Sequence, residues 1–339
     1  MRITLNLLFI LFGCIIVFCQ SADPALMREP IIDMHLHAHR YNSNGPGPVP
    51  FCYPISTVIP YMDARENGIE VFMKKMSNPD CKNPIWSAES DEALFNGIVK
   101  QLEKYNVVAI ASGENDLALK WHRAAPNRIL PSVGFHLRKR GFTVDSLRIL
   151  IEEYGFIGLG EVTNQYHGIG VDDPGMDPFY ALAQELDIPV GIHMGSGAPG
   201  SPMTISPHFE VQLSNPLHLE KVIKKYPHIR LYIMHYAEPF IDELIAMLYH
   251  YPQLYVDIGG IQLTYPKAYF YEYHLKKMVS AGFGKRIMYG SDAMVWPELI
   301  GKSIEIIEGA EFLSYAQKRD ILYNNAARFL RIDNTGQNE

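Results

Sequence analysis

The stretch from Ile31 to Arg40, IIDMHLHAHR, decides how the rest of the chain is interpreted. Its apolar start predicts a β-strand, in which alternate side chains point to opposite faces. Regular alternation gives an apolar face made of Ile32, Met34 and Leu36. The opposite face would carry Asp33, His35 and His37. Burying an acid and two imidazoles without partners is costly. The polar face is therefore expected to meet either water or a group that takes nitrogen ligands.

Seven further apolar segments of strand length follow this one, and helical patterns separate most of them. They cover residues 107–112, 129–135, 156–162, 188–194, 229–235, 254–260 and 286–292. Eight strand–helix units with near-continuous apolar strands predict an α/β fold of the (β/α)8 TIM barrel type. The alternative is an open doubly wound sheet, but no glycine-rich phosphate loop follows the first strand.

Helix boundaries can also be predicted from local signals. Asn215 followed by Pro216 predicts a helix start, with apolar spacing continuing to residue 226. The segment 238–251 repeats this pattern with Pro239 near its start. Ser314 and Gln317 are spaced as a capping box for the last helix.

Residues 1–22 are expected to be a secretory signal peptide. A basic Arg2 precedes an apolar run from about Leu5 to Phe18, which is short for a membrane span. Cleavage near residues 19–22 would leave an exported protein, periplasmic or secreted. The alternatives are an uncleaved anchor and a lipoprotein attached through Cys14 or Cys19.

The remaining residues, 23–339, show no linker, repeat or compositional break, and we expect one domain. The segment of about 41–87 is rich in Pro, Gly and Asn and interrupts the strand–helix rhythm. We expect it to be an inserted excursion or lid over the catalytic end of the barrel. It contains Cys52 and Cys81, which an oxidising compartment would permit to bridge; two free thiols are the alternative.

The charge balance limits the class of partner. The chain has 30 Lys and Arg against 37 Asp and Glu, a formal net charge of −7. This balance gives no reason to expect a nucleic acid or an anionic membrane as partner. We expect a small-molecule substrate, and the sequence leaves open whether the chain forms a homo-oligomer.

Polar residues collect at the predicted C-terminal ends of the strands, where barrel enzymes place their chemistry. They are His35, His37, Glu161, His193, His235 and Asp292. Several imidazoles with carboxylates at one barrel mouth are typical ligands of Zn²⁺ or a similar divalent ion. His35 and His37 lie two residues apart and are expected to chelate one ion. Asp33 would lie about 6–7 Å deeper and act as a partner of the site rather than a ligand.

Several segments resemble the amidohydrolase superfamily. They are DMHLHAH (33–39), GIHMG (191–195), YIMHYAEP (232–239), YGSDAMVW (289–296) and NAARFL (325–330). The similarity runs from about Pro30 to Arg331. Within the superfamily, these segments most resemble the amidohydrolase-related branch, which includes aminocarboxymuconate semialdehyde decarboxylase and several lactone and amide hydrolases.

The resemblance implies a distorted barrel with one divalent ion, usually Zn²⁺, held by His35, His37, His193 and Asp292. Asp292 would take a proton from the attacking water and pass it to the leaving group. His235 would assist as a general base or stabilise the oxyanion, with a fifth ligand or a structural role as the alternative.

Glu161 departs from the pattern of this branch, which usually has no acid there. It resembles the metal-bridging glutamate of a different branch of the superfamily. Three roles stay open for it: holding a second ion, binding a polar substrate group, or forming a buried pair with Arg138, Lys139 or Arg140.

Four further residues are candidates for substrate contact. Arg40 follows the two histidines and is a candidate clamp for a substrate carboxylate, with a surface salt bridge as the alternative. His136, Tyr166 and His167 follow the third and fourth strands at the mouth.

These expectations favour a metal-dependent hydrolase of a small-molecule amide, ester or lactone. A nonoxidative metal-dependent decarboxylase is the alternative enzyme, and a non-catalytic binding barrel is the third reading. The sequence does not separate the two enzyme classes.

Overall fold

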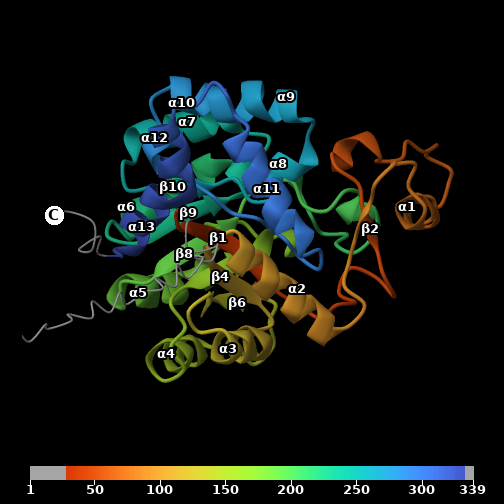
Figure 1. Ribbon diagram of the computed structural model, residues 1–339. Helices are drawn as coiled ribbons and strands as arrows, with labels where there is room; N and C mark the ends of the chain where they lie inside the picture. Colours follow the sequence, from red (N-terminus) through yellow and green to blue (C-terminus); the bar gives the residue numbers. More distant parts are fainter. Residues whose placement is uncertain (1–27, 333–339) are drawn as a thin grey trace, which may run out of the picture.

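A closed barrel of eight parallel strand positions lies at the centre of the computed structural model, which describes residues 28–332 (Figure 1). The strands are β1 (Ile31–Ala38), β4 (Val107–Gly113), β5 (Ile129–Pro131), β6 (Val133–Phe135), β7 (Leu159–Val162), β8 (Pro189–His193), β9 (Arg230–Met234), β10 (Tyr255–Asp257) and β11 (Ile287–Met288). The third position is divided at Ser132, because β5 pairs with β4 while β6 pairs with β7. The barrel closes where the Met34 N–H donates to the Tyr289 carbonyl at 2.9 Å. The predicted TIM barrel is confirmed.

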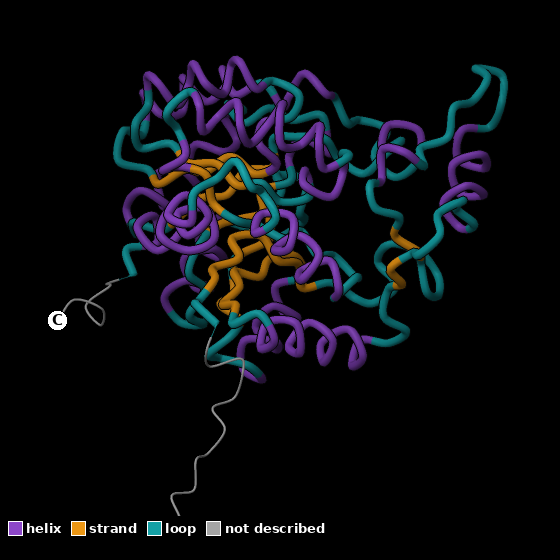
Figure 2. The backbone as a smooth tube through the Cα atoms, turned by 45° about the horizontal axis from the view of Figure 1, so that its top comes forward, coloured by secondary structure: helices purple, strands orange, loops and turns teal. Residues whose placement is uncertain are grey.

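Helices surround the strands on the outside, as the tube view shows (Figure 2). They are α2 (Asp91–Lys104), α3 (Asn115–Ala124), α4 (Val144–Glu152), α5 (Asp177–Glu185), α6 (Leu219–Lys225), α7 (Ile241–His250), α8 (Ile261–Thr264), α9 (Lys267–Tyr269), α10 (Lys277–Ser280), α11 (Glu298–Glu308), α12 (Tyr315–Arg319) and α13 (Asn325–Leu330). Their inner faces are apolar: α2 buries Leu94, Ile98 and Leu102, which recur every fourth residue. Among the described residues, no helix is both long enough and apolar enough to cross a membrane.

The predicted helix signals are present, although two helices begin later than expected. The Asn215 side chain accepts from Leu217 N–H and caps a short 3-10 turn, after which α6 begins at Leu219. The helix α7 begins at Ile241, past the expected start at 238. Ser314 and Gln317 form the expected reciprocal capping box at α12.

A β-bulge in β1 overturns the expected division of its side chains between two faces. Asp33 is paired with Ala109 and Leu36 with Ala111, so three residues of β1 span the distance of two in β4. Asp33 consequently shares the outward face of Leu36, and not the face of His37. Ile32 and Met34 face the barrel interior instead of the helices. The expectation of regular alternation from residue 31 to 37 is therefore wrong.

Apolar side chains fill the barrel interior beneath the polar groups. Met34 packs there with Tyr232, Met234 and Met288, and Phe329 of α13 covers this cluster. Because this end is closed by hydrophobic packing, the chemistry is confined to the C-terminal ends of the strands.

The segment after β1 leaves the barrel and extends to one side, where Figure 1 shows α1 and β2 apart from the helical ring. It contains β2 (Pro50–Phe51), α1 (Gly68–Ser77) and β3 (Ile85–Trp86), and β2 and β3 pair antiparallel. A disulfide joins Cys52 to Cys81, so the bridge and not the pair of free thiols is present. The excursion is attached to the barrel where Trp296 Nε1 donates to the Val49 carbonyl at 2.7 Å.

Candidate metal centre

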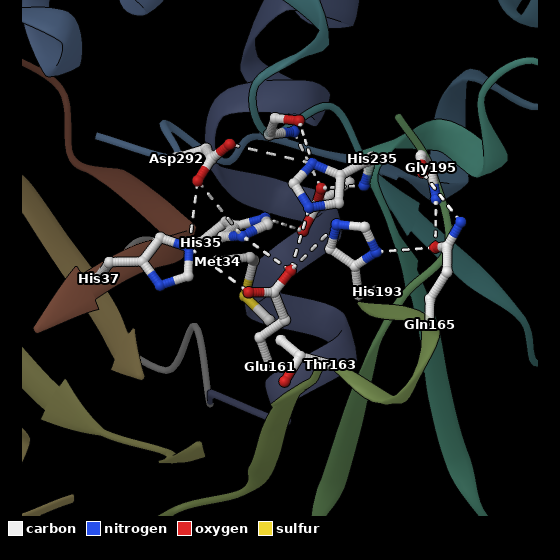
Figure 3. Close-up of polar contacts among 12 residues, drawn as sticks. Met34, His35, His37, Glu161, Thr163, Gln165, His193, Gly195, His235 and Asp292 are labelled. Carbon is white, nitrogen blue, oxygen red and sulfur yellow. Dashed lines mark hydrogen bonds and ion pairs between the residues drawn. The ribbon is translucent and has the colours of Figure 1, made fainter. Parts of the chain in front are cut away.

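The six polar side chains predicted at strand ends converge at the C-terminal end of the barrel (Figure 3). They are His35 and His37 of β1, Glu161 of β7, His193 of β8, His235 directly after β9 and Asp292 after β11. Five of the six are buried, whereas the Asp292 side chain keeps 19% of its exposure. Asp292 is therefore the member of the set that reaches furthest toward solvent.

Three of the imidazoles have their Nδ1 atom tied to an oxygen acceptor. His35 Nδ1 lies 3.1 Å from Asp257 Oδ2, and His193 Nδ1 lies 2.8 Å from Gln165 Oε1. His235 Nδ1 lies 2.9 Å from the Gly259 carbonyl oxygen. An imidazole that donates through Nδ1 and is neutral carries a lone pair on Nε2. All three rings thus aim Nε2 at the centre of the site, where a bound cation would displace any proton on that atom and take its lone pair.

These Nε2 atoms surround one oxygen of Glu161. Glu161 Oε1 lies 3.0 Å from His235 Nε2, 3.7 Å from His35 Nε2 and 3.9 Å from His193 Nε2. Among the described residues, the Nε2 atoms of His35 and His193 are buried without a hydrogen-bond partner. His37 Nε2 lies 3.5 Å from the other oxygen of Glu161 and 3.0 Å from Asp292 Oδ1.

Buried imidazole nitrogens without partners, facing carboxylates, are the arrangement that a divalent cation needs. Three overlapping groups have ligand atoms within 4.8 Å of one another: His35, His37 and Glu161; His35, His235 and Asp292; and Glu161, His193 and His235. Imidazole nitrogen and carboxylate oxygen are ligands of Zn²⁺ and related ions. The residues therefore fit a metal. Glu161 lies at the centre of the set, because its Oε1 atom is within 3.9 Å of the Nε2 atoms of three histidines.

Burial and neighbouring charges shift the pKa values of several groups in the site. Burial disfavours the charged form of His35, but Asp257 outweighs this effect and raises its pKa to about 10. Burial and the neighbouring His235 lower the pKa of His193 to about 3. Burial alone would raise the pKa of Asp292, yet the facing imidazoles of His37 and His35 lower it to about 2. Asp292 is accordingly ionised at neutral pH.

The backbone is strained where it carries the two residues predicted to be catalytic. His235 has φ of 59° and Asp292 has φ of 53°, in the left-handed region that L-residues rarely adopt. Such conformations persist only where the surroundings impose them, and they cluster at functional sites. Gly195 allows the close approach of His235, because a Cβ atom on Gly195 would lie 2.3 Å from the Cβ of His235.

Two functional residues were missed by the sequence analysis, namely Asp257 and Gln165. Asp257 is fully buried; its carboxylate binds His35 Nδ1 and accepts from the backbone N–H groups of His235, at 3.1 Å, and of Gly259, at 2.8 Å. An acid in the middle of the apolar segment 254–260 was the signal that could have found it. For Gln165 no comparable signal exists in the sequence. Asp33 accepts from His35 N–H at 3.0 Å and Ser291 N–H at 2.8 Å, so it supports the backbone of the site, as a partner and not a ligand.

Tyr166, His136 and His167 occupy the mouth near β6 to β8. The Tyr166 ring packs on the His193 ring at 4.6 Å. His136 and His167 lie against each other with ring centroids 4.1 Å apart. His167 directly follows Tyr166, so this pair lies beside the candidate metal ligands.

Arg40 and Glu161 have partners that differ from some of the expectations. Arg40 is held by three exposed carboxylates, those of Asp91, Glu114 and Asp116, which is the surface salt bridge and not a free clamp.

Among the described residues, the ion-pair partners of Glu161 are all histidines. The expected alternative of a Glu161 pair with Arg138, Lys139 or Arg140 is therefore wrong.

Comparison with known proteins identifies relatives of this architecture. A family model described as amidohydrolase matches residues 32–332. Among solved structures, an uncharacterized TIM-barrel protein from Bordetella bronchiseptica has a TM-score of 0.57 at 17% identity, covering 89% of this chain and 99% of the other. A probable 2-pyrone-4,6-dicarboxylic acid hydrolase from Acinetobacter baumannii gives 0.54 at 13% identity, covering 89% and 100%. A 5-carboxyvanillate decarboxylase from Sphingomonas paucimobilis gives 0.55 at 12% identity, covering 90% and 99%. No curated protein matches.

Proposed function

The chain belongs to the amidohydrolase family, and from this premise we propose that it is a metal-dependent hydrolase of a small-molecule amide, ester or lactone. One observation carries the proposal: three imidazoles whose Nδ1 atoms are tied elsewhere aim their Nε2 atoms at Glu161. Such an arrangement matches the metal centre of a metal-dependent enzyme. It therefore favours an enzyme over a non-catalytic barrel.

We propose that His35, His37, His193 and Asp292 hold one divalent ion, with Zn²⁺ as the expected metal and Glu161 as an additional ligand or the bridge to a second ion. When bound, such an ion supplies a Lewis acid that polarises a carbonyl oxygen and acidifies water. The buried Nε2 atoms of His35 and His193, which lack partners among the described residues, support this ligand set.

Asp292 and His235 are the proposed catalytic residues. Asp292 is ionised and the most exposed member of the set, so it can accept a proton from water and deliver it to a leaving group. His235 keeps its Nδ1 hydrogen on the Gly259 carbonyl. Its Nε2 atom, which lies 3.0 Å from Glu161 Oε1, is therefore the one that can exchange a proton with the reacting groups or stabilise an oxyanion.

The groups beside the mouth favour a substrate with an anionic group. His136 and His167 lie against each other with their rings tilted, and Arg138 and Lys139 follow His136 in the sequence. In the described part of the chain, none of these four side chains forms an ion pair with a carboxylate. A substrate carboxylate would supply that partner. We propose that His136, His167 and Tyr166 contact substrate, whereas Arg40 is occupied by its three carboxylates.

A carboxylate on the substrate keeps a second candidate open, a nonoxidative decarboxylase. Substrate carboxylate held beside the site is what this reaction requires, and one structural neighbour is named as a 5-carboxyvanillate decarboxylase. The reaction products distinguish the two: a hydrolase forms an acid by consuming water, whereas a decarboxylase releases carbon dioxide.

The test combines metal analysis with a panel of lactones, esters, amides and aromatic carboxylates. We expect about one equivalent of divalent metal per chain and turnover of one substrate class. His35→Ala should lose both metal and turnover, whereas His250→Ala, which removes an exposed histidine at the end of α7, should lose neither. Full metal occupancy and full turnover in His35→Ala would overturn the proposal.

We also propose that the protein is exported. The expected signal peptide lies in residues outside the described part of the chain, and the Cys52–Cys81 disulfide supports an oxidising compartment. The mass of protein from its native host should show an N-terminus between residues 19 and 24. A cytosolic chain that still begins at Met1 would contradict this.

A further inference from the structure

A buried acid that the mechanism does not use, Glu238, lies three residues after His235. Its side chain is 3% exposed. One carboxylate oxygen, Oε2, lies 2.5 Å from His274 Nε2, and the other, Oε1, accepts from the Tyr265 hydroxyl at 2.9 Å. His274 is fully buried and belongs to a π-helical segment, Phe270–Lys276. Three separate segments thus meet at one carboxylate.

The backbone between His235 and Glu238 explains what this carboxylate holds in place. His235, Tyr236 and Ala237 have φ of 59°, 60° and 52°, three consecutive non-glycine residues in the left-handed region. L-residues disfavour this conformation, so a run of three needs support from outside the turn.

That support comes from both ends of the turn. At its start, the His235 N–H donates to Asp257 Oδ1 at 3.1 Å. At its end, the Glu238 N–H donates to the His235 carbonyl at 3.0 Å, and the Glu238 side chain is tied to His274 and Tyr265. Between them, the buried Tyr236 donates its hydroxyl to the His274 carbonyl at 3.3 Å. His274 therefore contacts the turn through both its side chain and its backbone.

We propose that Glu238, bound to His274 and Tyr265, is a positioning residue that holds the left-handed turn so that His235 Nε2 faces Glu161. It acts through the backbone and touches neither substrate nor the reacting atoms. This inference rests on the proposed function only in giving His235 a role in turnover. The orientation of the His235 ring is a separate property that can be measured without substrate.

A neutral amide can serve the same geometry, and this makes the proposal testable. Glutamine at position 238 can accept from His274 Nε2–H through its oxygen and donate its NH₂ group to the Tyr265 hydroxyl, whereas alanine can do neither. We expect Glu238→Ala to lower kcat by about 10–100-fold. A displacement of up to about one ångström in a group at the reacting centre has an effect of this size. Its KM and metal content should stay near those of the parent, and Glu238→Gln should recover most of kcat.

The second readout is the ¹⁵N spectrum of the histidine rings in metal-free protein. The His235 signals should shift in Glu238→Ala and lie near their parent positions in Glu238→Gln. Tyr265→Phe and His274→Ala test the same network from other segments if Glu238→Ala fails to fold. This arm is independent of activity, so a failure of the proposed function would leave it intact.

A matched control lies at the opposite end of the barrel. Asp320 is buried, belongs to the other π-helical segment, and pairs with Lys285 at 2.7 Å. Asp320→Asn should lower stability without changing kcat or the His235 signals. The proposal is overturned if Glu238→Ala leaves kcat and the His235 signals unchanged. It is also overturned if both changes appear equally in Asp320→Asn.

Discussion

Replacing Asp257 with asparagine should weaken metal binding by changing the tautomer of His35. Three donors converge on the two oxygens of this buried carboxylate: His35 Nδ1 at 3.1 Å, His235 N–H at 3.1 Å and Gly259 N–H at 2.8 Å. Asparagine has only one oxygen. If that oxygen keeps the two backbone N–H groups, its NH₂ group faces His35 Nδ1. Two donors cannot face each other, so His35 would lose its Nδ1 proton and keep the one on Nε2, the atom that would bind metal.

The size of the effect follows from the role of such partners. Removing a hydrogen-bond partner of a ligating histidine typically costs about 10–100-fold in metal affinity, which corresponds to about 1.4–2.8 kcal/mol. The assay is a Zn²⁺ titration against a colorimetric chelator at neutral pH, with the ring ¹⁵N shifts of His35 reporting its tautomer.

Asp33→Asn is the matched control for this measurement. Asp33 is as fully buried as Asp257 and lies on β1, the strand that carries His35. It accepts from the backbone N–H groups of His35 and Ser291. Among the described residues, no imidazole nitrogen lies within hydrogen-bond distance of its carboxylate. It should change stability and leave the tautomer of His35 as it is. The reasoning is refuted if Asp257→Asn binds Zn²⁺ as tightly as the parent, or if Asp33→Asn weakens binding to the same extent.

Three further outcomes are expected. His235→Ala should keep most of its metal, as measured by elemental analysis. Its rate should fall by about 10²–10⁴-fold, the usual contribution of a general acid or base. A loss of metal in proportion to the loss of rate would make His235 a ligand. Glu161→Gln should still bind about one equivalent of metal per chain, and any kinetic effect should fall on the rate of substrate turnover. Two equivalents in the parent and one in the variant would show a second ion instead. The free energy of unfolding of the metal-free protein should fall as the pH is lowered from about 6.5 toward about 3. Urea unfolding at a series of pH values measures this change. Burial and neighbouring imidazoles lower the pKa of both His193 and His39 to about 3, so the unfolded chain binds protons in this range that the folded chain does not. Two such groups give a slope of at most about 2.7 kcal/mol per pH unit, and a flat profile would contradict the burial of these rings as neutral groups.

Local signals were sufficient where one short segment decides the structure. The apolar segments predicted the barrel strands, and the spacing of Ser314 and Gln317 predicted the cap of α12. The helix starts at Asn215 and Pro239 were displaced by a few residues, because 3-10 turns and loop backbone precede α6 and α7. Boundaries depend on how the end of a helix packs, and this is not encoded in capping residues alone.

The polar residues at strand ends were also predictable, because parallel strands bring their C-terminal ends to one edge. His35, His193 and Asp292 were therefore expected together and do lie together. Their protonation was not predictable. The acceptors that set it, Asp257 and Gln165, lie 222 residues from His35 and 28 residues from His193.

The sequence by itself determined the alternation of strands and helices, the eightfold count, and the chemistry of the groups at the barrel mouth. Only the tertiary structure decided how those groups are aimed. The bulge in β1 turns Asp33 away from His37, the neighbouring carboxylates occupy Arg40, and the histidines around Glu161 replace its expected basic partners. The physical reason is that periodicity and capping act within a few residues of the chain. Register shifts, ion pairs and tautomers, by contrast, are set by contacts between segments that only the closed barrel brings together.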